Sequence, residues 1–210
     1  MAERTPEDRL REEYFALLPD MRRVLEELEA KVRHCLLPLS SKLDKYERLV
    51  VKSRVKDCES ALGKLRKGQE GRIFDSGRVD SYTLTDLNDL AAVRVLAFPR
   101  SRWIEANREV RKLFSSWTSD PVPADDGGEE PLAFKYHGHC EASQTFLSEV
   151  QIVPMLIGLF WDVEHSAIYK PTQEIKRVQR KMKVHKSKVL AALKGFDEEF
   201  ERLLRADTLE

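Results

Sequence analysis

Cysteine is scarce in this chain, and the few copies form no recognisable pattern. The 210 residues contain three cysteines, Cys35, Cys58 and Cys140, an odd number without the spacing of a zinc site. This excludes a disulfide-rich secreted scaffold and indicates a reducing compartment. We therefore expect a cytoplasmic protein.

Long apolar runs are also missing. No segment approaches the roughly 20 consecutive apolar residues that a transmembrane helix needs. The first residues, MAERTPEDRL, are charged and lack the apolar centre of a secretory signal. Neither a membrane partner nor export is expected.

The chain has no net charge either, since 36 basic residues balance 36 acidic ones. Total charge therefore argues neither for nor against a polyanionic partner. The distribution is uneven: residues 118–131 hold five carboxylates and no base, whereas residues 173–188 hold seven Lys or Arg and one Glu. These segments predict an exposed acidic loop and a strongly basic helix.

Helical and extended patterns alternate, which predicts an α/β (α+β) fold of ordinary domain size. Apolar residues at helical spacing predict a long helix over residues 7–37, interrupted at Pro38. A second helix is expected after Ser40, whose side chain would cap it. Residues 48–55 then have an extended pattern, and residues 56–67 a helical one.

The second half of the chain contains the clearest strand signals. Residues 89–98 (DLAAVRVLAF) are apolar enough for a strand buried on both faces. Residues 134–143 and 145–153 are separated too briefly for a helix, so they predict an antiparallel hairpin. The remaining helices are expected at residues 102–114, 154–169 and 172–205.

The final helix has apolar residues close to a heptad repeat. We expect it to pack on the N-terminal helix, with a seam between two copies of the chain as the alternative. The expected organisation is an N-terminal helical extension (1–44), a core (45–171) and a C-terminal basic helix packed on the core (172–210).

Basic residues gather where the run 48–55 ends. Lys56, Ser60 and Lys64 are spaced four apart, which places them on one side of a helix close to Arg54. Fixed guanidinium and ammonium groups neutralise phosphate oxygens, so this cluster suits a triphosphate. Taken alone, the same spacing fits an ordinary solvated helix face better.

Two carboxylates stand beside strands. Asp89 precedes the buried strand, and Mg²⁺ typically takes one or two such carboxylates together with substrate phosphates. Glu149 and Gln151 alternate with apolar residues, which places both on one face of their strand. Arg94 is expected to face away from Asp89, either as a ligand contact or as a paired buried charge.

These residues belong to an ordered set that extends along most of the chain. In order, the set is Arg54, Lys56, Ser60, Lys64, Asp89, Arg94, Tyr136, Glu149, Gln151, Glu164, His165, Tyr169 and Lys170. Over roughly residues 45–171 this order resembles the RelA/SpoT-type (p)ppGpp (alarmone) synthetase domain. The spacing from Glu149 to Glu164 and His165 resembles that of the small single-domain synthetases.

The resemblance implies a nucleotidyltransferase-like mixed β-sheet flanked by helices. It also implies transfer of pyrophosphate from ATP to the 3′-hydroxyl of a guanine nucleotide. Asp89 and Glu149 would be catalytic and bind Mg²⁺, and Glu149 would orient or deprotonate the attacking hydroxyl. Arg54, Lys56 and Lys64 would hold the phosphates of ATP.

The resemblance further implies an acceptor site and a supporting set. The acceptor would contact Lys135 and Gln151, and its base would stack on the ring of Tyr136. The supporting residues would be Ser60, Arg94, Glu164 and His165.

Two alternatives remain open. The basic helix 173–188 fits an enzyme that modifies the 3′ end of transfer RNA, because clustered cations bind phosphates regardless of sequence. Four residues differ from the family pattern and fit a catalytically degenerate module that binds a nucleotide or RNA: Cys140, Val153, Pro154 and Gly158. A homo-oligomer and a neutralising antitoxin are the further partners considered.

Overall fold

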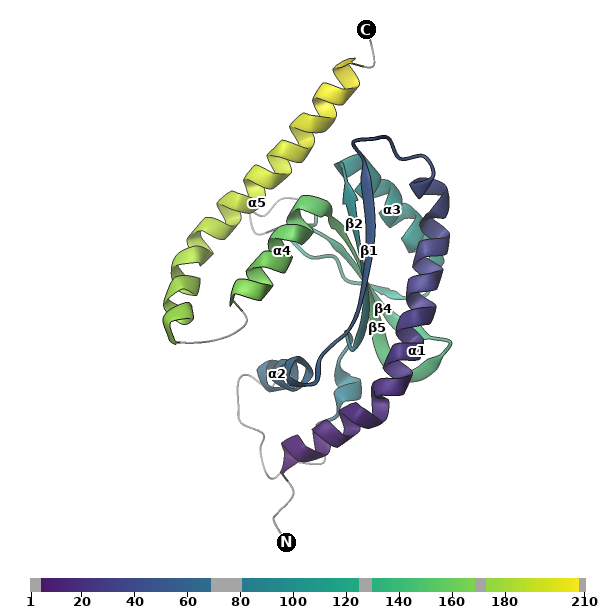
Figure 1. Ribbon diagram of the computed structural model, residues 1–210, viewed down its shortest axis with the longest axis vertical. Helices are drawn as coiled ribbons and strands as arrows, with labels where there is room; N and C mark the ends of the chain where they lie inside the picture. Colours follow the sequence, from purple (N-terminus) through teal and green to yellow (C-terminus); the bar gives the residue numbers. More distant parts are fainter. Residues whose placement is uncertain (1–4, 69–80, 125–129, 169–172, 208–210) are drawn as a thin grey trace.

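A computed structural model describes residues 5–68, 81–124, 130–168 and 173–207 (Figure 1). The side chains of residues 66–68, 166–184 and 207 are not part of this description. The fold is mixed α/β, with a five-stranded sheet flanked by helices, as expected from the sequence.

The sheet has the strand order β1-β2-β5-β4-β3. These strands span Arg48–Val55 (β1), Ala91–Phe98 (β2), Ser143–Pro154 (β5), Phe134–Cys140 (β4) and Thr118–Ser119 (β3). β2 and β5 run parallel at the centre, whereas β1, β4 and β3 pair antiparallel with their neighbours. The predicted hairpin is confirmed as β4 and β5.

One face of the sheet is covered by α1 (Pro6–Ser40) and α3 (Arg100–Leu113) (Figure 1). Helix α1 starts at a capping box, in which Thr5 and Asp8 satisfy each other's backbone N–H groups. The apolar side of α1 and the inward residues of the strands form the main core. Its largest fully buried side chains include Leu10, Met21, Leu28, Leu62, Tyr136, Phe146 and Ile152.

The other face carries α4 (Met155–Ile168) and α5 (Gln173–Asp207), while α2 (Cys58–Gly68) lies near one end of the sheet (Figure 1). A second, smaller apolar cluster joins this layer to the sheet through Leu96, Val153, Ile157 and Leu190. A Cβ atom at Gly158 would lie 2.3 Å from Leu96 Cδ2, so glycine permits the close approach of α4. None of the helices in the described ranges is both long and apolar enough to cross a membrane.

Helix α5 also supplies the N-terminal cap of α3. The N-cap residue Pro99 makes no side-chain cap bond. Instead, Asp197 Oδ1 accepts from the backbone N–H of Arg100 at 2.9 Å, and Glu201 accepts from the N–H of Ser101. Two carboxylates from a distant segment thus satisfy donors that the first turn of any helix leaves unpaired.

Three expectations about helices are wrong. Helix α1 continues through Pro38 to Ser40, because a proline in the last turn removes only one intrahelical hydrogen bond. No helix follows Ser40; residues 41–47 form turns before β1. The final helix packs on α4 and α3, across the sheet from α1, so it does not pack on the N-terminal helix (Figure 1).

Candidate active site

The strand register gathers polar side chains on the sheet face that carries α4. Residues in register on neighbouring strands share a face, as does every second residue along a strand. Two rows therefore cross β1, β2, β5 and β4: Lys52, Arg94, Gln151 and Lys135, and next to them Arg54, Ala92, Glu149 and His137.

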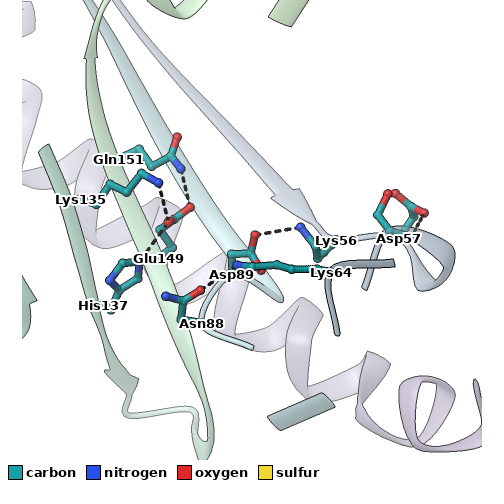
Figure 2. A network of polar contacts seen from close by, with 10 residues as sticks. Lys56, Asp57, Lys64, Asn88, Asp89, Lys135, His137, Glu149 and Gln151 are labelled. Carbon is teal, nitrogen blue, oxygen red and sulfur yellow. Dashed lines mark hydrogen bonds and ion pairs between the residues drawn. The ribbon is translucent and has the colours of Figure 1, made fainter. Parts of the chain in front are cut away.

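Asp89 lies just before β2 and is held by two lysines (Figure 2). Lys56 Nζ donates to Asp89 Oδ2 at 2.8 Å, and both side chains are buried. Lys64 Nζ, from α2, lies 3.0 Å from Asp89 Oδ1. Burial acts to raise the pKa of Asp89, but the hydrogen bond and charge of Lys56 and the charge of Lys64 hold it below its usual value.

Glu149 lies near the middle of the face, with both carboxylate oxygens contacted (Figure 2). His137 Nε2 is 3.0 Å from Oε2, and Gln151 Nε2 donates to Oε1 at 2.5 Å. Lys135 Nζ lies 3.9 Å from Oε2. Burial acts to raise the pKa of Glu149, but the His137 hydrogen bond and the Lys135 charge outweigh it, so the pKa is lowered.

Asp89 lies close enough to Glu149 for its negative charge to act on the pKa of Glu149. The charge of Asp89 raises that pKa, whereas the charge of Lys135 lowers it. Asp89 Oδ1 is buried and accepts no hydrogen bond, despite the nearby ammonium of Lys64. Among the described residues, no three His, Cys, Asp or Glu side chains form a complete metal cage. Two ionised carboxylates fit Mg²⁺, which completes its shell with water and substrate phosphates.

Arg94 lies on the same face as Glu149, and the expectation that it faces away from Asp89 assumed a strand that reaches back to that residue. β2 begins at Ala91, and strand alternation therefore does not extend back to Asp89. Arg94 Nε donates to Gln151 Oε1 at 2.8 Å, and Arg94 Nη1 donates to Asp162 Oδ1 at 2.7 Å. Arg94 is thus a paired, partly buried charge.

The helical spacing assigned to the basic cluster is only partly correct. Helix α2 begins at Cys58, so Lys56 lies in the link before it, and only Ser60 and Lys64 are helical. Ser60 is in the first turn, where its N–H donates to Asp57 Oδ1 at 2.9 Å and its side chain also bonds Asp57. Lys56 and Lys64 nevertheless converge on Asp89.

Tyr136 is turned away from this face, which contradicts its expected role as a stacking platform for the acceptor base. It pairs in register with Val150, one residue out of phase with Glu149. Its side chain is 2% exposed, and its hydroxyl donates to Asn107 Oδ1 on α3 at 2.7 Å. The tyrosine ring is therefore part of the main core.

The residues expected near the end of α4 have separate positions. Glu164 Oε2 lies 2.9 Å from Lys186 Nζ, an ion pair that joins α4 to α5. Partial desolvation and the charges of Arg54 and Arg94 lower the pKa of His165, so this side chain lies near the cations of the face. Tyr169, Lys170 and most side chains of the basic helix 173–188 lie outside the described residues.

Three residues of the face were not anticipated from the sequence. His137 follows Lys135 by two residues, so strand alternation predicts that both side chains lie on one face. Lys52 similarly precedes Arg54 by two residues. Asp162 had no local signal, because it reaches Arg94 and Lys52 from helix α4.

Solved structures of similar fold include a small alarmone synthetase and a GTP pyrophosphokinase family protein. The chain superposes on small alarmone synthetase 1 from Bacillus subtilis bound to its product pppGpp with a TM-score of 0.64 and 19% identity, over 95% of this chain and 100% of that one. The AMPCPP-bound form of that protein gives a TM-score of 0.57, with 18% identity and coverage of 95% and 100%.

A GTP pyrophosphokinase family protein from Streptococcus pneumoniae also matches, with a TM-score of 0.57 and 18% identity over 93% of this chain and 94% of that one. No protein-family model and no curated protein sequence matches the chain. At these identities the likeness establishes a small-alarmone-synthetase-like fold.

Proposed function

We propose that this protein is a Mg²⁺-dependent pyrophosphotransferase that moves pyrophosphate from ATP to the 3′-hydroxyl of a guanine nucleotide. The observation that carries the proposal is a pair of neighbouring buried carboxylates beside cations: Lys56 and Lys64 contact Asp89, and Lys135 lies near Glu149. The charge of Asp89 acts on Glu149, so the two acids lie close enough to share a ligand. Structures of similar fold were solved with pppGpp and with AMPCPP, which supports nucleotides as the substrates.

The donor is assigned to the cations around Asp89. Lys56 and Lys64 already hold one carboxylate, and Arg54 is exposed on the neighbouring strand. Transfer of a phosphoryl-type group depends mainly on alignment and on neutralisation of charge, which such fixed cations provide. Mg²⁺ held by Asp89 and Glu149 would add charge neutralisation at the transferred group.

Glu149 is assigned to the acceptor hydroxyl. His137 and Gln151 fix the orientation of its carboxylate, and its lowered pKa keeps it able to accept a proton at neutral pH. The hydroxyl oxygen forms a bond to the β-phosphorus of ATP, and the bond from that phosphorus to the α-phosphate oxygen breaks. AMP leaves, and the hydroxyl proton passes to Glu149.

The test is incubation of the purified protein with Mg²⁺, γ-labelled ATP and one acceptor at a time: GDP, GTP, AMP, ADP or bulk transfer RNA. Label on GDP or GTP is the expected result. Label on RNA alone would assign the acceptor to RNA instead, and absence of transfer to every acceptor would contradict the enzyme function. Glu199→Gln is the matched control, since Glu199 pairs with Arg202 on the exposed side of α5.

A further inference from the structure

Asp162 of α4 neutralises two cations of the sheet face at once. Its Oδ1 accepts from Arg94 Nη1 at 2.7 Å, and its Oδ2 accepts from Lys52 Nζ at 2.7 Å. Lys52 and Arg94 are register partners on β1 and β2. One carboxylate thus forms ion pairs with both cations that β1 and β2 contribute to the row Lys52, Arg94, Gln151 and Lys135.

Cations outnumber acids around this carboxylate, although the charge of Glu149 also acts on Arg94. The charge of Arg54 acts on Arg94, and Arg54, Arg94 and Lys56 all act on His165 one turn further along α4. Glu164, the neighbouring acid of α4, pairs with Lys186 of α5. Asp162 therefore supplies negative charge to a region that favours anions.

The Asp162 ion pairs are not needed to attach α4 to the sheet. That attachment is made by the apolar cluster of Leu96, Val153, Ile157 and Leu190, with Gly158 allowing the close approach. Burial of several aliphatic side chains contributes about 1.5 to 3 kcal/mol each. The more exposed of the two pairs, Lys52–Asp162, contributes about 1 kcal/mol or less, so its partners exchange at little cost, whereas the Arg94 side chain is 22% exposed.

The exposure of the pair permits such an exchange. The side chains of Lys52 and Asp162 are 46% and 39% exposed, so an incoming anion reaches them from solvent. A polyphosphate offers several oxygens and more than one negative charge, whereas Asp162 offers a single carboxylate. Cations that hold a carboxylate at hydrogen-bond distance have the geometry to hold phosphate oxygens in its place.

We propose that Asp162 is an internal counter-ion of the phosphate-binding face, which holds Lys52 and Arg94 while the face is empty and yields at least one of them to a polyphosphate chain. This inference rests on the proposed function, because it assigns Lys52 and Arg94 to the same nucleotide. Asp162 then sets how tightly the site binds its ligand, and removing its charge strengthens binding.

The experiment measures equilibrium binding of ATP and of inorganic tripolyphosphate, by calorimetry in EDTA, where no transfer occurs. Asp162→Asn keeps the size of the side chain and removes its charge; Asp162→Glu keeps the charge. Glu199→Gln removes one carboxylate from an exposed pair on α5 and controls for net charge. Thermal unfolding of each variant confirms that it is folded, and Asp162→Ser provides a second charge-free variant.

We expect Asp162→Asn and Asp162→Ser to bind both ligands about three- to tenfold more tightly than the wild type, with a steeper dependence on salt. Asp162→Glu and Glu199→Gln should bind like the wild type. In the Lys52→Gln background, Asp162→Asn should produce a smaller gain, because one of the released cations is missing.

Equal or weaker binding by Asp162→Asn would overturn the inference and make Asp162 a residue that positions Arg94. Binding of neither ligand by the wild type would overturn it together with the proposed donor site. Tighter binding by Asp162→Asn in a protein that transfers no label would support the counter-ion role while contradicting the proposed function.

Discussion

His137 and Glu149 face each other directly across the β4–β5 pair, with His137 Nε2 3.0 Å from Glu149 Oε2. Both side chains are buried, so neither can exchange its partner for water without a cost. The hairpin register therefore determines the orientation of the carboxylate that is proposed to act on the acceptor hydroxyl.

Replacement of His137 by alanine should lower the transfer rate. The Glu149 carboxylate would lose the partner of its Oε2 atom, and loss of such an orienting contact typically costs about 10- to 100-fold in activity. His139→Ala is the control, because His139 Nδ1 contacts the backbone oxygen of Phe146. Steady-state rates with saturating nucleotides measure the effect, and equal rates for the two variants would contradict it.

Asp89→Asn and Glu149→Gln should each abolish measurable transfer while the protein stays folded. Both changes keep the side-chain size and remove the negative charge proposed to bind Mg²⁺, a loss expected to cost about 100-fold or more. Transfer assays and circular dichroism check the two parts of the prediction. Activity within tenfold of the wild type in either variant would contradict the assignment of these carboxylates.

Lys56→Met should destabilise the protein more than Lys64→Met. Lys56 and Asp89 form a buried pair, with 8% and 9% exposure of their side chains, whereas the Lys64 side chain is 40% exposed. Breaking a buried pair costs about 3 kcal/mol or more, and loss of an exposed partner about 1 kcal/mol or less. Urea unfolding measures both variants, and adding Asp89→Asn to Lys56→Met should restore part of the loss.

Asp197→Asn should stabilise the protein at neutral pH. Burial raises the pKa of Asp197 from 3.8 to about 6. The folded state therefore keeps a proton that the unfolded chain has lost, so stability falls as pH rises from about 4 to about 6, and the loss persists above that range. Asparagine removes this loss, of about 2 to 3 kcal/mol, and still accepts from the Arg100 N–H.

Unfolding free energies measured from pH 4 to pH 8 test this expectation. Glu26→Gln, at an exposed acid of α1 on the other face of the sheet, is the control substitution and should leave the pH profile unchanged. An Asp197→Asn variant that is less stable than the wild type at pH 7 would show that the carboxylate charge itself is required for the cap.

Tyr136→Phe should reduce stability by about 1 kcal/mol, because Asn107 Oδ1 would lose its hydrogen-bond donor. The acceptor KM should not change, since the ring lies in the core. Tyr46→Phe, at an exposed tyrosine, is the matched control. Unchanged stability with a raised acceptor KM would place Tyr136 in the acceptor site after all.

Strand alternation explains what the sequence could reveal about this site. Glu149 and Gln151 stand out as polar residues at period two in an apolar run, and the structure places both on one face. Lys135 and Tyr136 were both expected at the acceptor, although alternation along a strand places neighbouring residues on opposite faces. Only the register with β5 shows that the face of Glu149 carries Lys135 and not Tyr136. The family motif alone predicts that Tyr136 faces the acceptor, but the strand register places its ring in the core.

The ends of elements limited the prediction elsewhere. Lys56 was assigned to a helix that begins two residues later, and Asp89 to a strand that begins two residues later. Both errors arise because spacing rules hold only inside an element. The contact of Asp162 with Lys52 and Arg94 depends on the packing of α4, which no local pattern encodes. The organisation into segments 1–44, 45–171 and 172–210 stays a prediction.

The cap that α5 provides for α3 makes two amide protons reporters of a distant contact. The N–H groups of Arg100 and Ser101 are bonded to Asp197 and Glu201, about a hundred positions further along the chain. Hydrogen–deuterium exchange at these two amides therefore measures how often α5 separates from the sheet layer. A rise in exchange there, with α1 still protected, would reveal opening of the C-terminal helix in a protein that otherwise remains folded.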